Sequence, residues 1–276
     1  MTASPAPSAA LVHSLMAAAL SDPQRLQDWA ARPELVERYG VDASTLDVST
    51  LADFAGMAEK IRHNQCREHL PLTFRLIRLT GVEVELFRTY APRSSQRRRQ
   101  GLTSVSDRLA GLAEFVDEWA DEGEPLRTLV RDVLWHEYLI SVLRAPESAS
   151  DAGTRPTADA DGALPVPAGQ IVVRQATCDP LQVARVLRAK EPDLACITRR
   201  PSTFVYHGAQ GRVRILEVEP GVAELLLVVD GRSSVEAIAD RLFGDETLVP
   251  HLRSTLEQLA DLGLLAWRSD GAVPCG

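Results

Sequence analysis

Hydrophobic positions in the first half of the chain recur at helical spacing, and no stretch of this half alternates with period two. The clearest case begins at residue 105, where apolar side chains follow one another at alternating steps of four and three: Val105, Leu109, Leu112, Val116 and Trp119. This pattern predicts a helix with one buried and one solvated face. Comparable stripes, punctuated by Pro and Gly, predict that residues 1–144 form an all-helical bundle.

Two long helices are predicted near the middle of this half. A mostly apolar stripe that reaches Leu70 consists of Leu51, Phe54, Ala58, Ile61 and Gln65. Pro71 interrupts that stripe, and a second long helix is predicted from Leu72, Leu76, Leu79 and Phe87. The last helix of the bundle is predicted after Pro125, with Leu126, Val130, Val133 and Leu134 at helical spacing.

The composition changes between residues 145 and 169. Prolines lie there among Ala, Ser, Thr, Asp and Gly, and apolar residues are few. Such a segment cannot bury enough apolar surface to fold alone. Residues 145–169 are therefore predicted to be a flexible linker to a second domain, residues 170–276.

The second domain mixes strand and helix patterns. A strand is predicted at Gln170–Arg174, a helix at Pro180–Lys190, and a pair of strands at Thr203–Tyr206 and Arg212–Leu216 that is joined by the loop 207–211. Three short helices follow, the second opened by a capping box at Ser233–Glu236, and a last strand closes the domain as the wing at Leu264–Trp267. These elements predict a winged helix-turn-helix module, and an α+β protein as a whole.

Net charge and cysteine content argue against several classes of protein. A formal net charge of −8 and a pI near 5.3 disfavour nucleic-acid binding. The cysteines are scattered without a CxxC pair, which predicts neither a zinc site nor a disulfide framework and suits a reducing compartment. The N-terminus lacks a basic signal region, and the apolar run Leu15–Leu20 is too short for a membrane span. A cytoplasmic protein without a membrane partner is expected.

The C-terminal part carries a pattern that is known from peptide-binding modules. Its most specific piece is the turn Asp230-Gly231-Arg232-Ser233-Ser234-Val235-Glu236-Ala237-Ile238-Ala239. This region resembles the recognition elements of ribosomally synthesised and post-translationally modified peptides (RiPPs), which are winged-helix modules that hold the leader of a precursor peptide. The usual element runs its three strands together, whereas here the predicted helix Pro180–Lys190 and the turn Pro192–Pro201 separate the first strand from the hairpin.

The N-terminal half carries a second resemblance. The stretches Leu20–Pro23, Arg32–Leu35, Tyr39–Val41 and His69–Thr73 are similar to the helical domain of partner proteins of multinuclear non-haem iron-dependent oxidative enzymes, such as those of the 3-thiaglutamate and methanobactin pathways. The resemblance implies that the helical domain docks on the iron enzyme to form a heterodimer, while the second domain presents the precursor leader. It also implies a non-catalytic chain without a cofactor of its own, because the iron belongs to the partner enzyme.

In the resembled modules the leader lies between the third strand and the third helix. By position, this implies a peptide-binding set of Arg212, Val213, Arg214, Ile215, Leu216, Arg253, Leu256 and Glu257. An extended peptide can add itself to an edge strand, whose main-chain groups are unpaired. The alternation of arginines with Val213 and Ile215 predicts a basic face that suits an acidic leader and a second face that packs inward. The alternative is a basic face that is merely solvated.

Other candidate sites are weaker. His63, Cys66 and His69 recur at steps of three, which carries ligands progressively around a helix, so a mixed helix surface is favoured over a metal site. His136 and Glu137 are neighbours on a predicted helix and point apart, which favours core positions over a catalytic pair. The cluster Arg93 with Arg97–Arg99 is predicted in a turn after Pro92, either contacting an acidic partner or nucleic acid or forming a solvated loop. No Walker, GxSxG or HExxH motif is present, so no catalytic or metal residues are predicted.

Two alternative functions remain open. A winged-helix transcriptional regulator would need a strongly basic recognition helix, and the third helix instead balances Glu257 and Asp261 against Arg253 and His251. An enzyme that used His136 or the His63 group would need a bound metal. The interpretation favoured by the sequence is a recognition subunit in RiPP natural-product biosynthesis.

Overall fold

The computed structural model describes residues 9–42, 44, 46–120, 124–144 and 163–268, which fold as two compact units. The first unit contains the described residues up to Tyr138 together with Leu187–Pro192, and the second contains the other described residues. Helices build the first unit, and the second combines helices with small antiparallel sheets, which confirms the α+β class. Within the described ranges, no helix is both long enough and apolar enough to cross a membrane.

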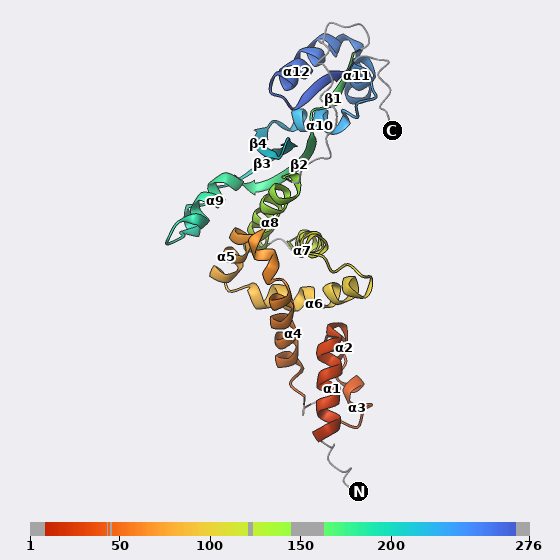
Figure 1. Ribbon diagram of the computed structural model, residues 1–276, viewed down its shortest axis with the longest axis vertical. Helices are drawn as coiled ribbons and strands as arrows, with labels where there is room; N and C mark the ends of the chain where they lie inside the picture. Colours follow the sequence, from red (N-terminus) through yellow and green to blue (C-terminus); the bar gives the residue numbers. More distant parts are fainter. Residues whose placement is uncertain (1–8, 43, 45, 121–123, 145–162, 269–276) are drawn as a thin grey trace. The chain divides into compact units, whose positions relative to one another are not determined.

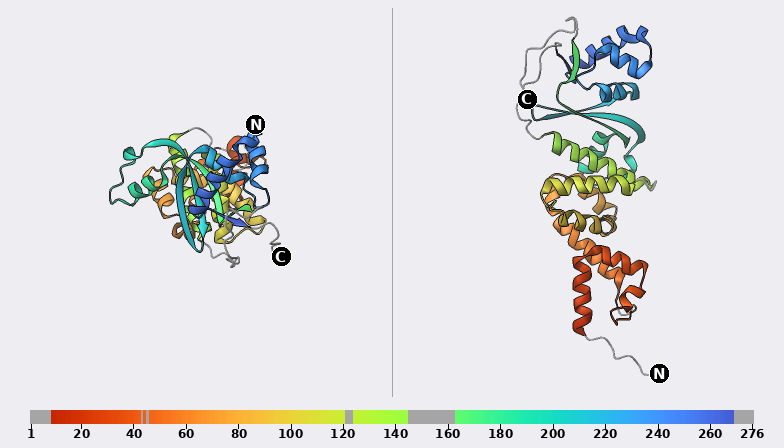
Figure 2. Two further views of the ribbon diagram at one scale, coloured as in Figure 1. Left: turned by 90° about the horizontal axis from the view of Figure 1, so that it is seen from above. Right: turned by 90° about the vertical axis from the view of Figure 1, so that its right-hand side faces the viewer.

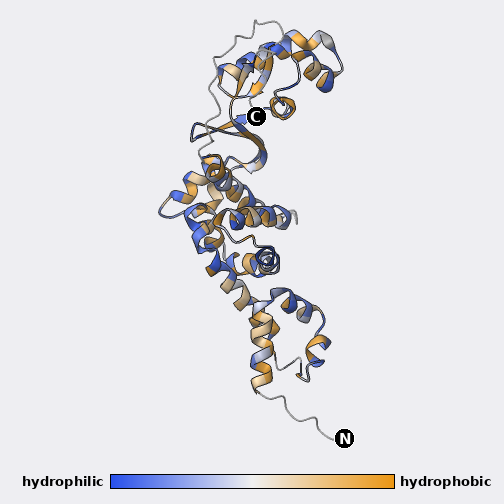
Figure 3. Ribbon diagram, turned by 45° about the vertical axis from the view of Figure 1, so that its right-hand side comes forward, coloured by the Kyte–Doolittle hydropathy of each residue, from blue (hydrophilic) through white to orange (hydrophobic). Residues whose placement is uncertain are grey.

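Helices follow one another through the first half of the chain (Figure 1). In order, they are α1 (Ala9–Ser21), α2 (Pro23–Ala31), α3 (Glu34–Glu37), α4 (Val48–Arg62), the 3-10 helix Asn64–Glu68, α5 (Pro71–Leu79), α6 (Glu83–Arg99), α7 (Val105–Ala120) and α8 (Pro125–Leu143). Helix α1 is rich in apolar residues and is largely orange in Figure 3. It packs with α2, α3 and the start of α4 around Leu15, Leu26 and Trp29. Asp47 begins α4 by accepting a hydrogen bond from the N–H of Thr50.

The helices α7 and α8 confirm the predictions from hydrophobic spacing. In α7 the predicted stripe is buried from its second member onward, with Val105 half-buried at the start of the helix. In α8 the buried side chains include Val130, Val133 and Leu134. Large apolar residues at steps of three and four therefore identified the inward faces of both helices.

The predicted stripe of α4 was right at Leu51 and wrong at Phe54 and Ile61. The buried residues of this helix are Leu51, Ala55, Gly56 and Glu59, whereas Phe54 is 60% and Ile61 is 65% exposed. Gly56 gives the physical reason, because a Cβ atom at this position would lie 2.8 Å from the backbone nitrogen of Arg88 on α6. Helix α4 therefore approaches α6 closely at Gly56, and Phe54 and Ile61 remain exposed.

The long helix predicted after Pro71 is divided in two. Helix α5 ends at Leu79, and Gly81 has a φ of 75°, a left-handed conformation that terminates helices and that glycine adopts at little cost. Helix α6 then begins at Glu83 and continues through Pro92 to Arg99. The arginine cluster therefore lies on a helix, and the turn predicted after Pro92 was wrong.

A three-stranded antiparallel sheet lies at the centre of the second unit. Its order is β2 (Gln170–Cys178), β3 (Arg199–Ala209) and β4 (Arg212–Val218), with β3 in the middle. Helix α9 (Pro180–Arg188) lies between β2 and β3 in the chain, as predicted, and β2 still pairs with β3 in register from Gln170 opposite Gly208 to Ala176 opposite Ser202. The insertion therefore leaves the first strand in the sheet.

The predicted hairpin is confirmed, but its loop is shorter than expected. Strands β3 and β4 are joined by Gln210 and Gly211 alone, with φ values of 51° and 71°. Two successive positive φ values are typical of the type I′ turn, which matches the twist of a tight hairpin. Gly208, which was placed in the loop, belongs to β3 and pairs with Val213. Glycine is required there because a Cβ atom would lie 2.8 Å from Cβ of Leu143.

Helix α10 (Pro220–Val228) lies on one face of this sheet, and two further helices share the core of that face (Figures 1 and 2). These two are α11 (Val235–Phe243) and α12 (Val249–Asp261), and all three helices were predicted. Ile238, Leu256 and Val205 of β3 are among the fully buried residues of the core beneath them. The N-cap of α11 is Ser234, whose side chain accepts from the N–H of Ala237, so the capping box predicted from Ser233 was wrong by one residue.

The linker prediction was wrong at its C-terminal end. Leu164–Pro167 forms strand β1, which pairs antiparallel with β5 (Leu265–Arg268), the strand that was expected to be the wing. Residues 145–162 of the predicted linker lie outside the described residues.

Candidate functional site

The outer edge of strand β4 is the main candidate for peptide binding. Strand β4 pairs with β3 on one side, and no other described strand pairs with it. In a two-residue hairpin the residues that flank the turn form a hydrogen-bonded pair, and the bonding alternates from there. The flanking pair is Ala209 and Arg212, so the main-chain N–H and C=O groups of Val213, Ile215 and Glu217 point away from β3. These groups are available to an added strand.

The arginines of β4 lie on the face that carries the helices. Residues directly opposite each other in an antiparallel pair share a face, and Leu216 lies opposite Val205 of the core. Arg212 and Arg214 alternate with Val213 and Ile215 and therefore share the face of Leu216. Val213 and Ile215 are half-buried on the opposite face, where Ile215 lies opposite the buried Tyr206, so the prediction that this second face packs inward holds in part.

The two arginines differ in their contacts. Arg214 donates from Nη1 to the carbonyl oxygen of Leu262, just past the end of α12, and so connects β4 to this helix. Arg212 is exposed and makes no hydrogen bond or ion pair with the described residues. Arg212 is therefore the positive charge at this edge that remains available to an acidic peptide.

The candidate residues on α12 are less accessible than predicted. Nη2 of Arg253 lies 3.4 Å from Oε1 of Glu236 on α11, and Glu257 is half-buried. Leu256 is 0% exposed and belongs to the core, so its assignment to a peptide groove is corrected. Of the predicted peptide-binding residues, those of β4 are thus more accessible than Leu256 of α12.

The first unit contains a buried polar cluster that was not predicted from the sequence. Glu59 is fully buried, and its carboxylate accepts hydrogen bonds from Ser94 Oγ and from Arg98 Nη1, the latter at 2.8 Å. Arg62 Nη1 lies 3.0 Å from the same carboxylate. His63 Nδ1 lies 2.9 Å from the main-chain oxygen of Glu59 and 3.2 Å from Oε1. A glutamate followed by a histidine four residues later was the available sequence signal.

This environment makes Glu59 strongly acidic. Burial by itself raises the pKa of the Glu59 carboxyl, but hydrogen bonds from His63 and Ser94 and the positive charge of Arg98 lower it to about 2. Because the folded pKa lies below the ordinary value of 4.5, ionised Glu59 stabilises the folded state above that value. This stability is lost as the pH falls from there toward 2.

We expect the Glu59 interaction to contribute to acid unfolding. Between about pH 6 and about pH 3, its loss lowers the free energy of unfolding by about 2 kcal/mol. Urea titrations of the wild type and of Glu59→Gln at both pH values measure this contribution, because the variant lacks the titrating group. An equal change in stability for the two proteins would contradict the assignment.

The three candidate metal ligands do not form one site. His63 and Cys66 are buried, whereas His69 is exposed beyond the end of the 3-10 helix. In the part of the chain that the structure describes, no group of three or more His, Cys, Asp or Glu side chains is arranged to hold a metal ion. Burial raises the pKa of the Cys66 thiol to about 11, against a smaller opposing effect of Arg108, which makes Cys66 a poor thiolate ligand.

Glu137 and His136 are core residues, as the sequence analysis favoured. Oε1 of Glu137 accepts the N–H of Leu72 at 2.8 Å, and Oε2 accepts the N–H and the hydroxyl of Thr73 at 2.7 and 2.8 Å. These are N–H groups of the first turn of α5, which have no acceptor within the helix. Glu137 therefore caps α5 from a distant helix.

The arginine cluster forms ion pairs instead of a solvated loop. Four arginines in the last two turns of α6 contact carboxylates of neighbouring helices: Arg93 with Glu118 and Glu114, Arg97 with Glu114, Arg98 with Glu59, and Arg99 with Asp22. These contacts attach the end of α6 to α4 and α7 and to the turn before α2. The expectation of a basic loop for nucleic acid or an acidic partner loses its structural basis.

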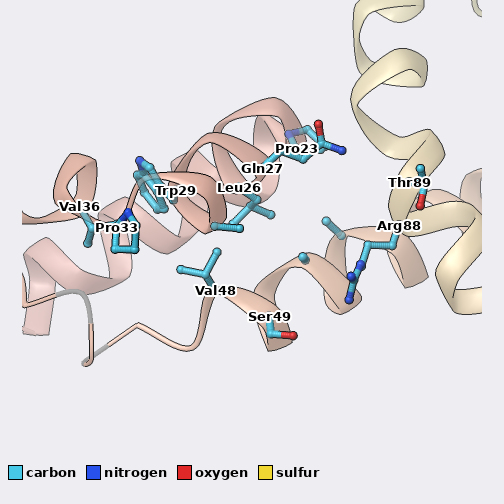
Figure 4. A pocket seen from close by; sticks show the side chains of 13 residues that line it. Pro23, Leu26, Gln27, Trp29, Pro33, Val36, Val48, Ser49, Arg88 and Thr89 are labelled. Atoms are coloured by element: carbon cyan, nitrogen blue, oxygen red, sulfur yellow. The ribbon is translucent and has the colours of Figure 1, made fainter.

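Helix α4 borders an apolar cavity and carries exposed apolar side chains of its own. A cavity of about 460 Å³ lies between α2 and α4, where Leu26 and Trp29 of α2 face Val48 of α4 (Figure 4). Elsewhere on α4, Phe54, Met57 and Ile61 are 60%, 50% and 65% exposed. Their spacing of three and four places them on one side of the helix, and we call these three residues the α4 stripe.

No protein-family model matches the chain, and no curated protein is significantly similar to it.

Proposed function

We propose that this chain is a non-catalytic recognition subunit, which binds the leader of a ribosomally synthesised precursor peptide in the cytoplasm and presents it to an iron-dependent oxidative enzyme. The resemblances in its sequence suggest this function, and the observation that carries it is the outer edge of β4, which pairs with no other described strand. Main-chain groups at such an edge bind an extended peptide largely regardless of its sequence, and nearby side chains add selectivity.

The second unit serves in this proposal as a winged-helix-like recognition module. The succession of a strand, a hairpin, three short helices and a closing strand supports this interpretation. Arg212 favours a leader with acidic residues, although one exposed ion pair adds only about 0–1 kcal/mol. The main chain of β4 would therefore supply most of the affinity.

The first unit would dock on the enzyme through the α4 stripe. Large apolar side chains such as Phe54, Met57 and Ile61 are seldom exposed together on one helix face unless that surface binds another molecule. Apolar contact area of this kind is typical of stable subunit interfaces. The iron and the oxidative chemistry would reside in the partner.

We expect affinity capture from the native host to separate the two roles. Tagged wild-type protein should retain both a short acidic peptide and an iron-dependent oxidative enzyme, identified by mass spectrometry. Arg212→Glu should reduce peptide recovery about tenfold, since it repels an acidic leader, and should leave the enzyme bound. Phe54→Asp should lose the enzyme and keep the peptide.

Two outcomes would count against this function. Recovery of DNA or transcription proteins alone would favour the regulator. Equal recovery of peptide and enzyme by all three proteins would show that neither surface is used. Circular dichroism of the variants checks that each substitution leaves the fold intact, which is expected because both side chains are exposed.

A further inference from the structure

A second cavity of the first unit carries an excess of positive charge. It has a volume of about 250 Å³ and lies at the buried polar cluster, between α4, α6 and the start of α7. Its lining includes four arginines but only two carboxylates. The arginines are Arg62, Arg97, Arg98 and Arg108, and the carboxylates are Glu59 and Asp107. The guanidinium groups at the wall therefore outnumber the carboxylates by two, which favours the binding of an anion.

Two of the arginines are fully engaged by the protein. Arg97 donates from Nη1 to Glu114 and from Nη2 to the carbonyl oxygen of Asp107. Arg108 donates from Nη1 to the carbonyl oxygen of Arg62 and from Nη2 to Gln65. These contacts hold both guanidinium groups in fixed positions at the wall of the cavity.

The other two arginines use only one of their guanidinium nitrogens in contacts with described residues. Arg62 and Arg98 both contact Glu59 through Nη1, and Arg98 Nη1 also contacts Ser94. Among the described residues, neither Nε nor Nη2 of these two arginines has an acceptor. One carboxylate therefore accepts from two guanidinium groups, and both of these arginines line the cavity with N–H groups that donate to no described residue.

Neutral donors complete the wall. Tyr90 and Thr103 also line the cavity. Burial raises the pKa of the Tyr90 hydroxyl, with smaller opposing effects of Arg97 and Arg93, so this group stays protonated and able to donate. Guanidinium and hydroxyl donors around a small space are the groups that bind phosphate oxygens.

We propose that this cavity binds a phosphate group, either as inorganic phosphate or on a small metabolite. The volume is below the 300–1,000 Å³ that is usual for drug-sized ligands, which restricts the occupant to a small molecule. Arg62 and Arg98 bind the anion with their unused N–H groups, and Glu59 positions both guanidinium groups. The site is independent of the peptide-binding edge of β4, so the two proposals succeed or fail separately.

Phosphorus NMR titration of the full chain with inorganic phosphate, in a chloride buffer of constant ionic strength, tests the proposal. We expect saturable binding that becomes about tenfold weaker in Arg62→Gln and in Arg98→Gln, since each loses a charged hydrogen-bond donor. The matched control is Arg88→Gln on α6, whose Nη1 pairs with Asp53 outside the cavity and which should bind as the wild type does.

The Glu59→Gln variant should change the affinity for phosphate in the opposite direction from the arginine variants. The variant keeps an amide oxygen that can accept from Arg62 and Arg98 but removes the negative charge from the wall, so it should bind phosphate about tenfold more tightly, provided that circular dichroism shows a folded protein. If Glu59→Gln or Arg98→Gln does not fold, the exposed Arg62→Gln decides. Binding that does not saturate, or that is equal in the wild type, Arg62→Gln and Arg88→Gln, would overturn the proposal.

A titration with glycerol 3-phosphate distinguishes a site for inorganic phosphate from a site for a small phosphorylated metabolite. Tighter binding than that of inorganic phosphate would assign the cavity to a phosphate monoester, and weaker binding would assign it to free phosphate. Either order, together with the Arg62→Gln effect, supports the site.

Discussion

Replacement of Glu137 with Ala should lower the free energy of unfolding of the first unit by about 4 kcal/mol. Its carboxylate accepts three hydrogen bonds, from the N–H groups of Leu72 and Thr73 and from the hydroxyl of Thr73. Leu72 and Thr73 are buried, so after the substitution water cannot readily replace the lost acceptor. Each unsatisfied buried donor costs about 1–3 kcal/mol.

The position of Glu137 at the start of α5 adds to the effect. The first N–H groups of a helix have no acceptor within it, and the N-terminus carries partial positive charge. Pro71 has no N–H, so Leu72 and Thr73 provide the first donors of α5. One distant carboxylate satisfies both of them and also connects α5 to α8.

Urea unfolding followed by circular dichroism measures this loss, and hydrogen exchange of the α5 amides localises it. Glu137→Gln keeps one acceptor oxygen and should lose only about 2 kcal/mol. The matched control is Glu118→Ala on α7, an exposed carboxylate whose loss should cost at most about 1 kcal/mol. A Glu137→Ala protein as stable as the Glu118→Ala control would show that the cap contributes little.

Hydrophobic spacing predicted those helices in which the largest apolar residues face inward. It succeeded for α7 and failed for α4, where Gly56 allows close approach to α6 and leaves Phe54 and Ile61 outside. Periodicity identifies an apolar face but not whether a core or another molecule covers it. The same limit hid the polar cluster, because a buried glutamate such as Glu59 depends on arginines that are distant in sequence.

The end of β3 and the strand β1 were not predicted because both contain residues that are unusual at these positions. Gln210 adopts a positive φ that is uncommon for residues other than glycine, so a two-residue turn was not expected at this position. Strand β1 contains Pro165 and Pro167, and proline normally argues against a strand. Two residues apart, both prolines place their missing N–H on the same edge of the strand, which a two-stranded pair tolerates.

The candidate peptide site was predicted in part. The sequence identified β4 and its arginines, and hairpin pairing decides which main-chain groups of the strand are free. What the sequence could not show is that Arg214 is held by the end of α12 and that Leu256 lies in the core. Both depend on how the three helices pack on the sheet.

Ile215→Pro should weaken binding of the captured peptide about 100-fold. The proline removes the N–H of Ile215, which points away from β3, and its ring obstructs an added strand. Proline is tolerated at a strand edge where the N–H faces solvent, so the pairing of β3 and β4 should survive. Ile215→Ala is the matched control, because it loses the same side chain but keeps the N–H.

The affinity of the captured peptide for the wild type, Ile215→Ala and Ile215→Pro, measured by isothermal titration calorimetry, tests peptide recognition at the edge of β4 most directly. We expect Ile215→Ala to bind within a few-fold of the wild type and Ile215→Pro to bind about 100-fold more weakly. Equal affinities of the proline and alanine variants, with both folded, would contradict strand addition at β4.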